Sequence, residues 1–106
     1  MEKSFIPYGK QSISNEDIDA VIKVLESPLI TQGPVVPLFE KELSLTVCSK
    51  FAIAFNSATS ALHSACLALG ISDNDLVWTS PNTFVASANC ALYCGAKIDF
   101  IDIDIS

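Results

Sequence analysis

Several residue types are absent or scarce in this 106-residue sequence, and each scarcity excludes a class of protein. Arginine is absent, and six lysines stand against twelve acidic residues, so the net charge is −6. This charge has the wrong sign for binding a phosphodiester backbone or an anionic membrane. No apolar run reaches the roughly 18 residues that a membrane span needs. The sequence therefore predicts a protein that binds neither nucleic acid nor a membrane.

Histidine and cysteine are too few, or too widely spaced, for a typical metal site. The chain has one histidine, and its four cysteines form no CxxC pair; they are Cys48, Cys66, Cys90 and Cys94. Residues 1–10 also lack the apolar core of a secretory signal. We therefore expect no metal, and four reduced cysteines packed as small hydrophobic side chains in a cytoplasmic protein.

The residues that are present predict a folded α/β chain. Half are hydrophobic and only 17% are charged, which suits one small domain. Residues 1–50 are expected to form an arm and two helices. The first helix is capped by Ser14 with Asp17 three residues later, and the second begins near Pro34 to Pro37. Each has an apolar stripe expected to face a core: Ile18, Val21, Ile22 and Leu25 in the first, and Val36, Phe39, Leu43 and Val47 in the second.

Residues 51–106 alternate between strand and helix patterns. Strands are expected at 51–55, 76–79 and 98–103, and helices at 58–69 and 84–93. The inward side chains expected on the first of these helices are Leu62, Ala65, Cys66 and Leu69. Such alternation predicts βαβ crossovers and a mostly parallel sheet with flanking helices. Because the last strand has no helix after it, we expect these residues to be the front part of a longer polypeptide and an incomplete domain.

Two strand-to-helix junctions are the candidate binding sites. Ser57, Ala58, Thr59 and Ser60 are small residues at a helix start, where unpaired amides and the helix dipole favour an anion such as a phosphate. Ser57 or Thr59 could equally be a plain helix cap. Phe84, in the second junction, could stack on a flat ligand or simply cover the sheet. Neither junction contains a P-loop or a GxGxxG turn.

The segments NSATSALHSACLALGI, VWTSPNTFVASANCALYCGA and DFIDID resemble the start of the DegT/DnrJ/EryC1/StrS family of sugar aminotransferases, which use pyridoxal 5′-phosphate (PLP). IPYGKQSIS, LESPLITQGP and FEKEL extend the resemblance over essentially the whole chain. Within the family, the similarity is greatest to transaminases of the pseudaminic acid pathway. It implies the amino-terminal part of a fold-type I PLP-dependent transferase. The expected reaction aminates C4 of a UDP-4-keto-6-deoxy-N-acetylhexosamine, with glutamate as donor, in a homodimer.

The resemblance also implies roles for particular residues. Ser57, Ala58, Thr59 and Ser60 would hold the cofactor phosphate, and Phe84 would lie against the pyridine ring. The nucleotide sugar would contact Ala58 and two irregular segments, in this subunit's site or in that of a neighbouring subunit. The residues of these segments are Tyr8, Pro28, Leu29, Ile30 and Thr31.

No catalytic residue of the family is expected among these 106 residues. The Schiff-base lysine, the aspartate that pairs with the pyridine nitrogen and its neighbouring histidine would all follow Ser106. We therefore expect this chain alone to be inactive as a transaminase. The alternative left open is a noncatalytic α/β module that binds a phosphate ligand or has a structural role.

Overall fold

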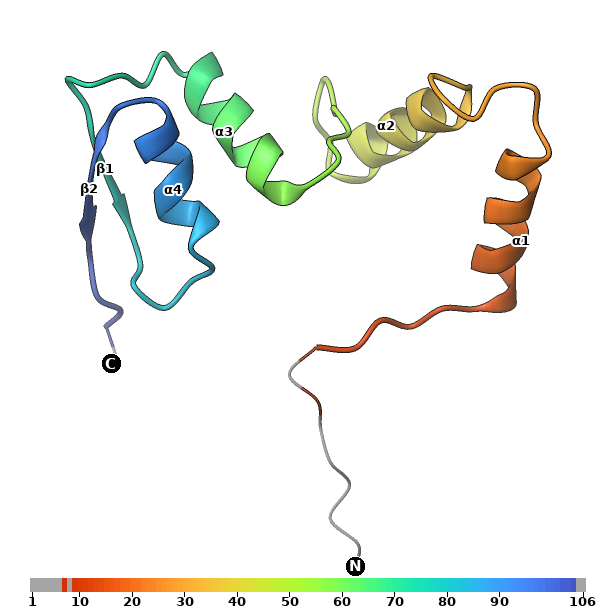
Figure 1. The fold of residues 1–106 in the computed structure, drawn as a ribbon, viewed down its shortest axis with the longest axis horizontal. Coiled ribbons are helices and arrows are strands. Elements are labelled where there is room, and N and C mark those ends of the chain that lie inside the picture. Colours follow the sequence, from red (N-terminus) through yellow and green to blue (C-terminus); the bar gives the residue numbers. More distant parts are fainter. Residues whose placement is uncertain (1–6, 8, 105–106) are drawn as a thin grey trace, which may run out of the picture. The chain divides into compact units, whose positions relative to one another are not determined.

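The structure is a computed structural model that describes residue 7 and residues 9–104. The chain divides into two compact units, with the boundary between Phe51 and Ala52. The first unit contains helices α1 (Asn15–Leu25) and α2 (Val35–Thr46). The second contains α3 (Ala58–Ala68), β1 (Leu76–Thr79), α4 (Ala86–Tyr93) and β2 (Lys97–Phe100) (Figure 1). Each unit is described by itself.

Helix α1 begins with the capping box expected from the sequence. The Ser14 amide donates to Asp17 Oδ2 at 2.8 Å, and the Asp17 amide donates to Ser14 Oγ at 3.3 Å. The hydrogen bond from the Ser14 backbone, followed by that from its hydroxyl, lowers the pKa of Asp17. The cap therefore holds a carboxylate at the positive end of the helix dipole.

Helix α2 follows a tight turn and begins after Pro34, in agreement with the proline signal. Gln32 in this turn has a positive φ of 53°. A Cβ added to Gly33 would lie 2.7 Å from the carbonyl oxygen of Leu29, so the turn needs glycine there.

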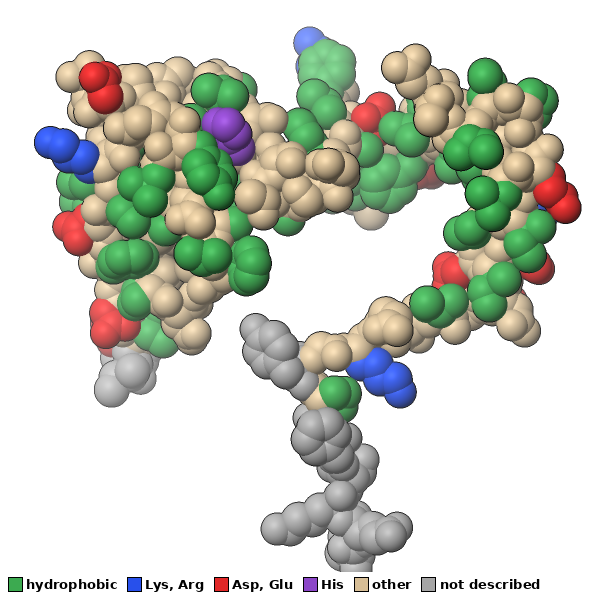
Figure 2. All heavy atoms as spheres, in the orientation of Figure 1, with side chains coloured by type: hydrophobic (Ala, Val, Ile, Leu, Met, Phe, Trp, Pro, Cys, Tyr) green, Lys and Arg blue, Asp and Glu red, His purple; other side chains and the backbone are tan. Residues whose placement is uncertain are grey.

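The expectation that both helices bury an apolar stripe is wrong for the described structure. Neither α1 nor α2 has a buried residue. No described element covers the two stripes, and Figure 2 shows many apolar side chains at the surface. The exposed stripe residues are Ile18, Val21, Ile22, Leu25, Val36, Phe39, Leu43 and Val47.

The second unit is a β1–α4–β2 crossover with α3 packed against α4. β1 and β2 pair in parallel, with Leu76 opposite Lys97 and Thr79 opposite Phe100. This pairing confirms the predicted parallel arrangement. Helix α4 contacts both strands and α3, and it therefore forms the centre of the unit.

The core of this unit is built from small side chains. Ala91 is completely inaccessible to solvent, and the other buried residues are Cys66, Ala86, Ala88, Cys90 and Ala96. Small residues let a helix approach a neighbouring helix and sheet closely. Of the four inward residues expected on α3, only Cys66 is buried, whereas Leu62, Ala65 and Leu69 are exposed.

Two predicted strands differ from the structure. Residues 51–55 belong to no strand of the described structure, whose sheet consists of β1 and β2. The last strand ends at Phe100 rather than Ile103, because its partner β1 is only four residues long. The described helices are all too short or too polar to cross a lipid bilayer.

Candidate functional site

The first turn of α3 has the geometry of an anion-binding helix start. Ser57 is the N-cap, with an extended backbone (φ −157°, ψ 154°), and its Oγ accepts the Ser60 amide at 3.1 Å. The hydroxyl groups of Ser57 and Ser60 lie 3.0 Å apart. Ser57 therefore has the capping role that the sequence left open, and its side chain fixes the shape of the turn.

Two amides of this turn remain available to a ligand. Among the described residues, no acceptor pairs with the amides of Ala58 and Thr59, the first two residues of the helix. Ala58 is exposed and Thr59 is half-buried, so the turn is open to solvent. Unpaired amides at the positive end of a helix dipole suit a phosphate group. Thr59 also carries a hydroxyl group, which is a further hydrogen-bond donor, so the residue types of this turn suit an anionic group.

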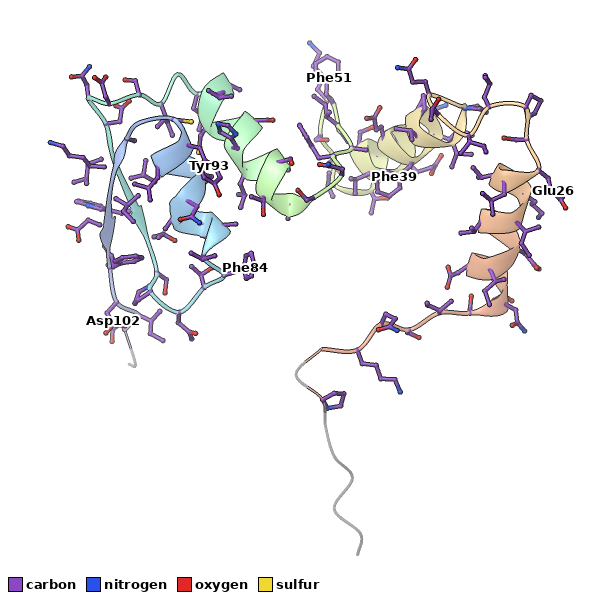
Figure 3. The ribbon with its side chains drawn as sticks, viewed as in Figure 1. Glu26, Phe39, Phe51, Phe84, Tyr93 and Asp102 are labelled. Atoms are coloured by element: carbon purple, nitrogen blue, oxygen red, sulfur yellow. The ribbon has the colours of Figure 1, made fainter. Side chains whose placement is uncertain are left out.

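Phe84 lies in the loop between β1 and α4. The residue is 75% exposed, so it does not cover the sheet of the described structure, which was the alternative role expected for it. Figure 3 shows the ring on the outside of the loop. Two polar contacts shape this loop: the Asn82 amide donates to Ser80 Oγ at 3.2 Å, and Thr83 Oγ1 lies 3.0 Å from Ser87 Oγ. An exposed aromatic ring on a loop held in this way is available to stack on a flat ligand.

The contact between α3 and α4 brings the two candidate junctions, the first turn of α3 and the loop before α4, into one structural unit. Both helices lie in the second unit and pack on each other, and their first turns lie at the right-hand side of this unit in Figure 1. The ring of His63 in α3 contacts that of Tyr93 in α4 edge-to-face, with centroids 5.3 Å apart. The Phe84 loop leads directly into α4, so the helix pair positions both the anion-binding turn and the aromatic ring.

The predicted nucleotide-sugar contacts lie in the first unit. Residues 28–31 lie in the turn between α1 and α2, where the Ser27 hydroxyl donates to the carbonyl oxygens of Val24 (2.7 Å) and Leu29 (3.1 Å). Leu29 and Ile30 are exposed. The expectation for Tyr8 falls outside the described residues.

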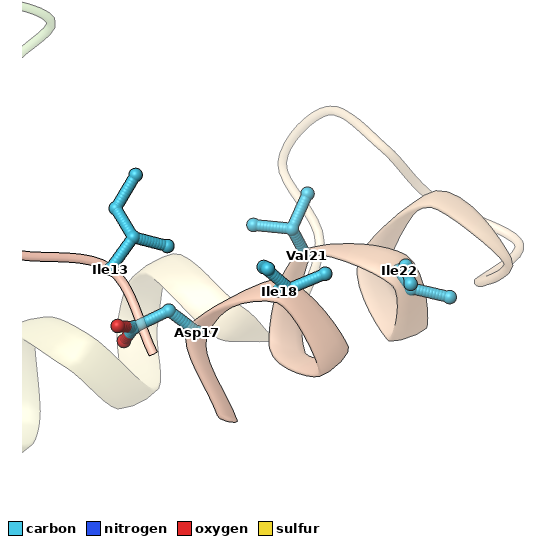
Figure 4. A pocket seen from close by; sticks show the side chains of 5 residues that line it. All are labelled: Ile13, Asp17, Ile18, Val21 and Ile22. Atoms are coloured by element: carbon cyan, nitrogen blue, oxygen red, sulfur yellow. The ribbon is translucent and has the colours of Figure 1, made fainter. Parts of the chain in front are cut away.

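The described cavities do not coincide with these candidate residues. One of about 330 Å³ lies along α1, lined by Ile13, Asp17, Ile18, Val21 and Ile22 (Figure 4). Two others lie between α1 and the start of α2. The lining is almost entirely apolar, without the convergent polar groups that a cofactor pocket needs.

The sequence did not indicate that three of the four cysteines lie together. Cys90 in α4 and Cys94 at its C-cap are one turn apart, but nothing in the spacing shows that both influence Cys66 of α3. Burial of Cys66, together with the adjacent thiols, raises the pKa of its thiol to about 11. Cys48, expected to be packed as a small hydrophobe, is instead exposed after the end of α2.

The fold and the family agree. Residues 11–106 match the model of the DegT/DnrJ/EryC1/StrS aminotransferase family, and the chain therefore belongs to this family. Aminotransferases of this family depend on PLP.

The chain is similar to several individual proteins of known name or structure. The chain is 49% identical over 98 residues to UDP-4-amino-4,6-dideoxy-N-acetyl-β-L-altrosamine transaminase of Campylobacter jejuni, covering 92% of this chain and 26% of that protein. It is 45% identical over 100 residues to the spore coat polysaccharide biosynthesis protein SpsC of Bacillus subtilis, covering 94% of this chain and 26% of that protein. A putative sugar aminotransferase of Streptococcus pneumoniae, solved in PLP and PMP forms, superposes with a TM-score of 0.86 at 31% identity, over 93% of this chain and 25% of that one. The chain thus spans about a quarter of the length of the relatives that it matches.

Proposed function

We propose that these residues form the phosphate-binding and ring-stacking part of a PLP-dependent nucleotide-sugar aminotransferase. The observation that carries the proposal is the open first turn of α3, in which the amides of Ala58 and Thr59 lack an acceptor among the described residues. Because the chain belongs to a PLP-dependent family, we take the ligand of this turn to be the phosphate group of PLP.

Each candidate residue then has a distinct part. The Ala58 and Thr59 amides and the Thr59 hydroxyl donate hydrogen bonds to the phosphate. Ser57 and Ser60 hold the turn in shape through their mutual contacts. Phe84 lies flat against the cofactor ring and excludes water from one of its faces. When bound, PLP supplies an electron sink for the transfer of an amino group, and the protein provides binding and orientation.

The proposed substrate is a UDP-linked 4-keto-6-deoxy-N-acetylhexosamine that is aminated at C4, with glutamate as the amino donor. The Campylobacter relative, whose name specifies a UDP-4-amino sugar, supports this choice. We assign the sugar contacts to Tyr8, to residues 28–31 and to Ala58, and we propose that two copies of the protein pair. The exposed apolar stripes of α1 and α2 support such pairing. Pseudaminic acid biosynthesis in the cytoplasm is the proposed setting.

Binding of the cofactor by the 106-residue chain tests the phosphate assignment. Absorbance and fluorescence titrations with PLP should show saturable binding, and pyridoxal, which lacks the phosphate, should bind at least about tenfold more weakly, since it forfeits the charge-assisted hydrogen bonds. Equal binding of PLP and pyridoxal would exclude the α3 turn as a phosphate site.

Catalysis is tested separately. The chain incubated with PLP, glutamate and the keto sugar should form no amino sugar, because we assign the cofactor's covalent lysine to none of its six lysines. After borohydride reduction of the mixture, the chain should likewise carry no covalently bound PLP at a ratio of one cofactor to one chain. Turnover by this chain would contradict that assignment, whereas PLP binding without turnover also fits a noncatalytic phosphate-binding module.

A further inference from the structure

Ser87 ties the loop that carries Phe84 to the first turn of α4. Its backbone amide donates to the Phe84 carbonyl oxygen at 3.0 Å, and its Oγ lies 3.0 Å from Thr83 Oγ1. Ser87 is the second residue of α4. One helical residue therefore contacts both the residue that carries the exposed ring and the residue before it.

Ser87 is itself held in place by the core of the second unit. Its two neighbours in α4, Ala86 and Ala88, are only 3% and 6% exposed, and α4 packs on α3 and on both strands. Thr83 and Phe84 are exposed, whereas Ser87 is half-buried. The exposed loop is thus attached to a residue whose position the core determines.

The two contacts act on opposite sides of the Phe84 Cα atom. The Ser87 amide holds the carbonyl group that follows this atom, and the hydroxyl contact holds Thr83, whose peptide group precedes it. Because the Cα atom is tetrahedral, the backbone atoms on its two sides determine the direction of the bond to the ring. The amide contact needs no particular side chain at position 87, whereas the contact with Thr83 needs the serine hydroxyl.

We propose that Ser87 is a positioning residue, whose hydroxyl contact with Thr83 holds Phe84 in the orientation that stacks on the cofactor ring. This inference rests on the proposed function, because it takes the ligand of Phe84 to be the pyridine ring of PLP. In this role Ser87 touches no cofactor atom, and it orders the loop before the ligand arrives. A loop that is already ordered loses less conformational entropy on binding, so the affinity is higher.

Titration of single variants with PLP tests the hydroxyl contact. Ser87→Ala should weaken PLP binding about three- to tenfold, which is the cost of immobilising one loop side chain on binding. Its helix content should not fall, because alanine is the best helix former. Thr83→Val, which removes the other hydroxyl, should have the same effect, and Thr83→Ser, which keeps it, should bind PLP like the unmodified chain.

Ser44→Ala is the matched control. It removes a helical serine hydroxyl in the first unit, where Ser44 Oγ donates to the Lys41 carbonyl oxygen at 2.8 Å. PLP binding should be unchanged in this variant.

A double-variant comparison distinguishes positioning from a general effect on the fold. Phe84→Ala should itself weaken PLP binding about tenfold, because the stacked ring is lost. Adding Ser87→Ala to Phe84→Ala should weaken binding no further, because the ring that Ser87 positions is already absent. An effect of Ser87 on the fold as a whole would instead lower the affinity by the same factor in both backgrounds.

NMR relaxation of the chain without ligand tests the loop directly. The order parameter of the Phe84 amide should fall in Ser87→Ala and in Thr83→Val, and it should be retained in Thr83→Ser.

The outcomes separate the two proposals. If the unmodified chain does not bind PLP, or if Phe84→Ala binds it as tightly as the unmodified chain does, the proposed function fails and this inference fails with it. If both of those tests succeed, three results would overturn the positioning role alone: PLP binding by Ser87→Ala that is as tight as that of the unmodified chain, an equal loss in the Phe84→Ala background, or an unchanged Phe84 order parameter.

Discussion

Replacing Ala58 with proline would remove one proposed phosphate donor without disturbing the helix that presents it. Ala58 is the first residue of α3, so its backbone already has the helical φ that proline requires. Ser57 before it is extended, as the residue preceding a proline prefers. No described group accepts the lost amide, so no internal hydrogen bond is broken. Most substitutions at a binding turn change both shape and donors, whereas this one deletes a single N–H.

The expected loss of PLP affinity in Ala58→Pro depends on how exposed the turn is to solvent. A hydrogen bond to a charged group contributes about 1.5–3 kcal/mol. Since Ala58 is exposed, the lower end applies, and Ala58→Pro should weaken PLP binding about tenfold. Stability should stay the same or rise by up to about 1 kcal/mol, because proline restricts the unfolded chain. Titration with PLP and thermal unfolding followed by circular dichroism measure the two quantities.

Asn15→Pro is the matched control. Asn15 is the first residue of α1, and Ser14 before it is also extended (φ −98°, ψ 171°). The same substitution at this helix should leave PLP binding unchanged. If Ala58→Pro binds PLP as tightly as the unmodified chain while the helix is retained, the Ala58 amide does not contact the phosphate. If both variants weaken binding equally, the effect does not arise at the α3 turn.

Three further predictions concern stability. Gly33→Ala should destabilise the first unit by about 1–3 kcal/mol in a urea titration, because the new Cβ would lie 2.7 Å from the Leu29 carbonyl oxygen; an unchanged midpoint would show that the turn relaxes freely. The pKa of Asp17 is lowered in the folded chain, so the stability it contributes is present above its ordinary value of 3.8 and is lost as the pH falls through the lowered pKa. Asp17→Asn should remove that part of the acid dependence of α1 helicity, measured by circular dichroism, and an identical acid profile would refute the role of the carboxylate. The pKa of Cys66 is raised from 9.0 to about 11, so stability should fall between those pH values as the unfolded thiol ionises first; Cys66→Ala should reduce this alkaline loss in urea titrations at pH 8 and pH 10.5, and an undiminished loss would assign it to other groups.

Local signals in the sequence predicted most of the elements. Ser14 and Asp17 marked the start of α1, and the alternation of strand and helix patterns predicted β1, α4 and β2 with parallel pairing. These features depend on residues close together in the chain. The strand expected at 51–55 is not part of the described sheet of β1 and β2, since apolar composition alone does not determine which segments join a sheet.

The sequence predicted which kind of ligand the candidate site suits, but it did not predict which hydrogen bonds and packing contacts its residues make. Small residues at 57–60 indicated an anion-binding turn, yet only the structure shows that the Ser57 oxygen is used within the helix cap and that two amides remain. The exposure of Phe84 and the approach of Cys66 to α4 depend on how helices pack, which spacing along one chain does not determine. The positions of the ligand contacts stay predictions.

The alanine-rich layer around α4 limits how this unit can diversify. Ala86, Ala88 and Ala91 are almost fully enclosed, so any larger side chain would push α4 away from its neighbours. The loop at 80–85 carries few such restrictions, because most of its side chains face solvent. Variation in ligand preference among descendants of this sequence should therefore concentrate in that loop, while the separation between the helix axes stays constant.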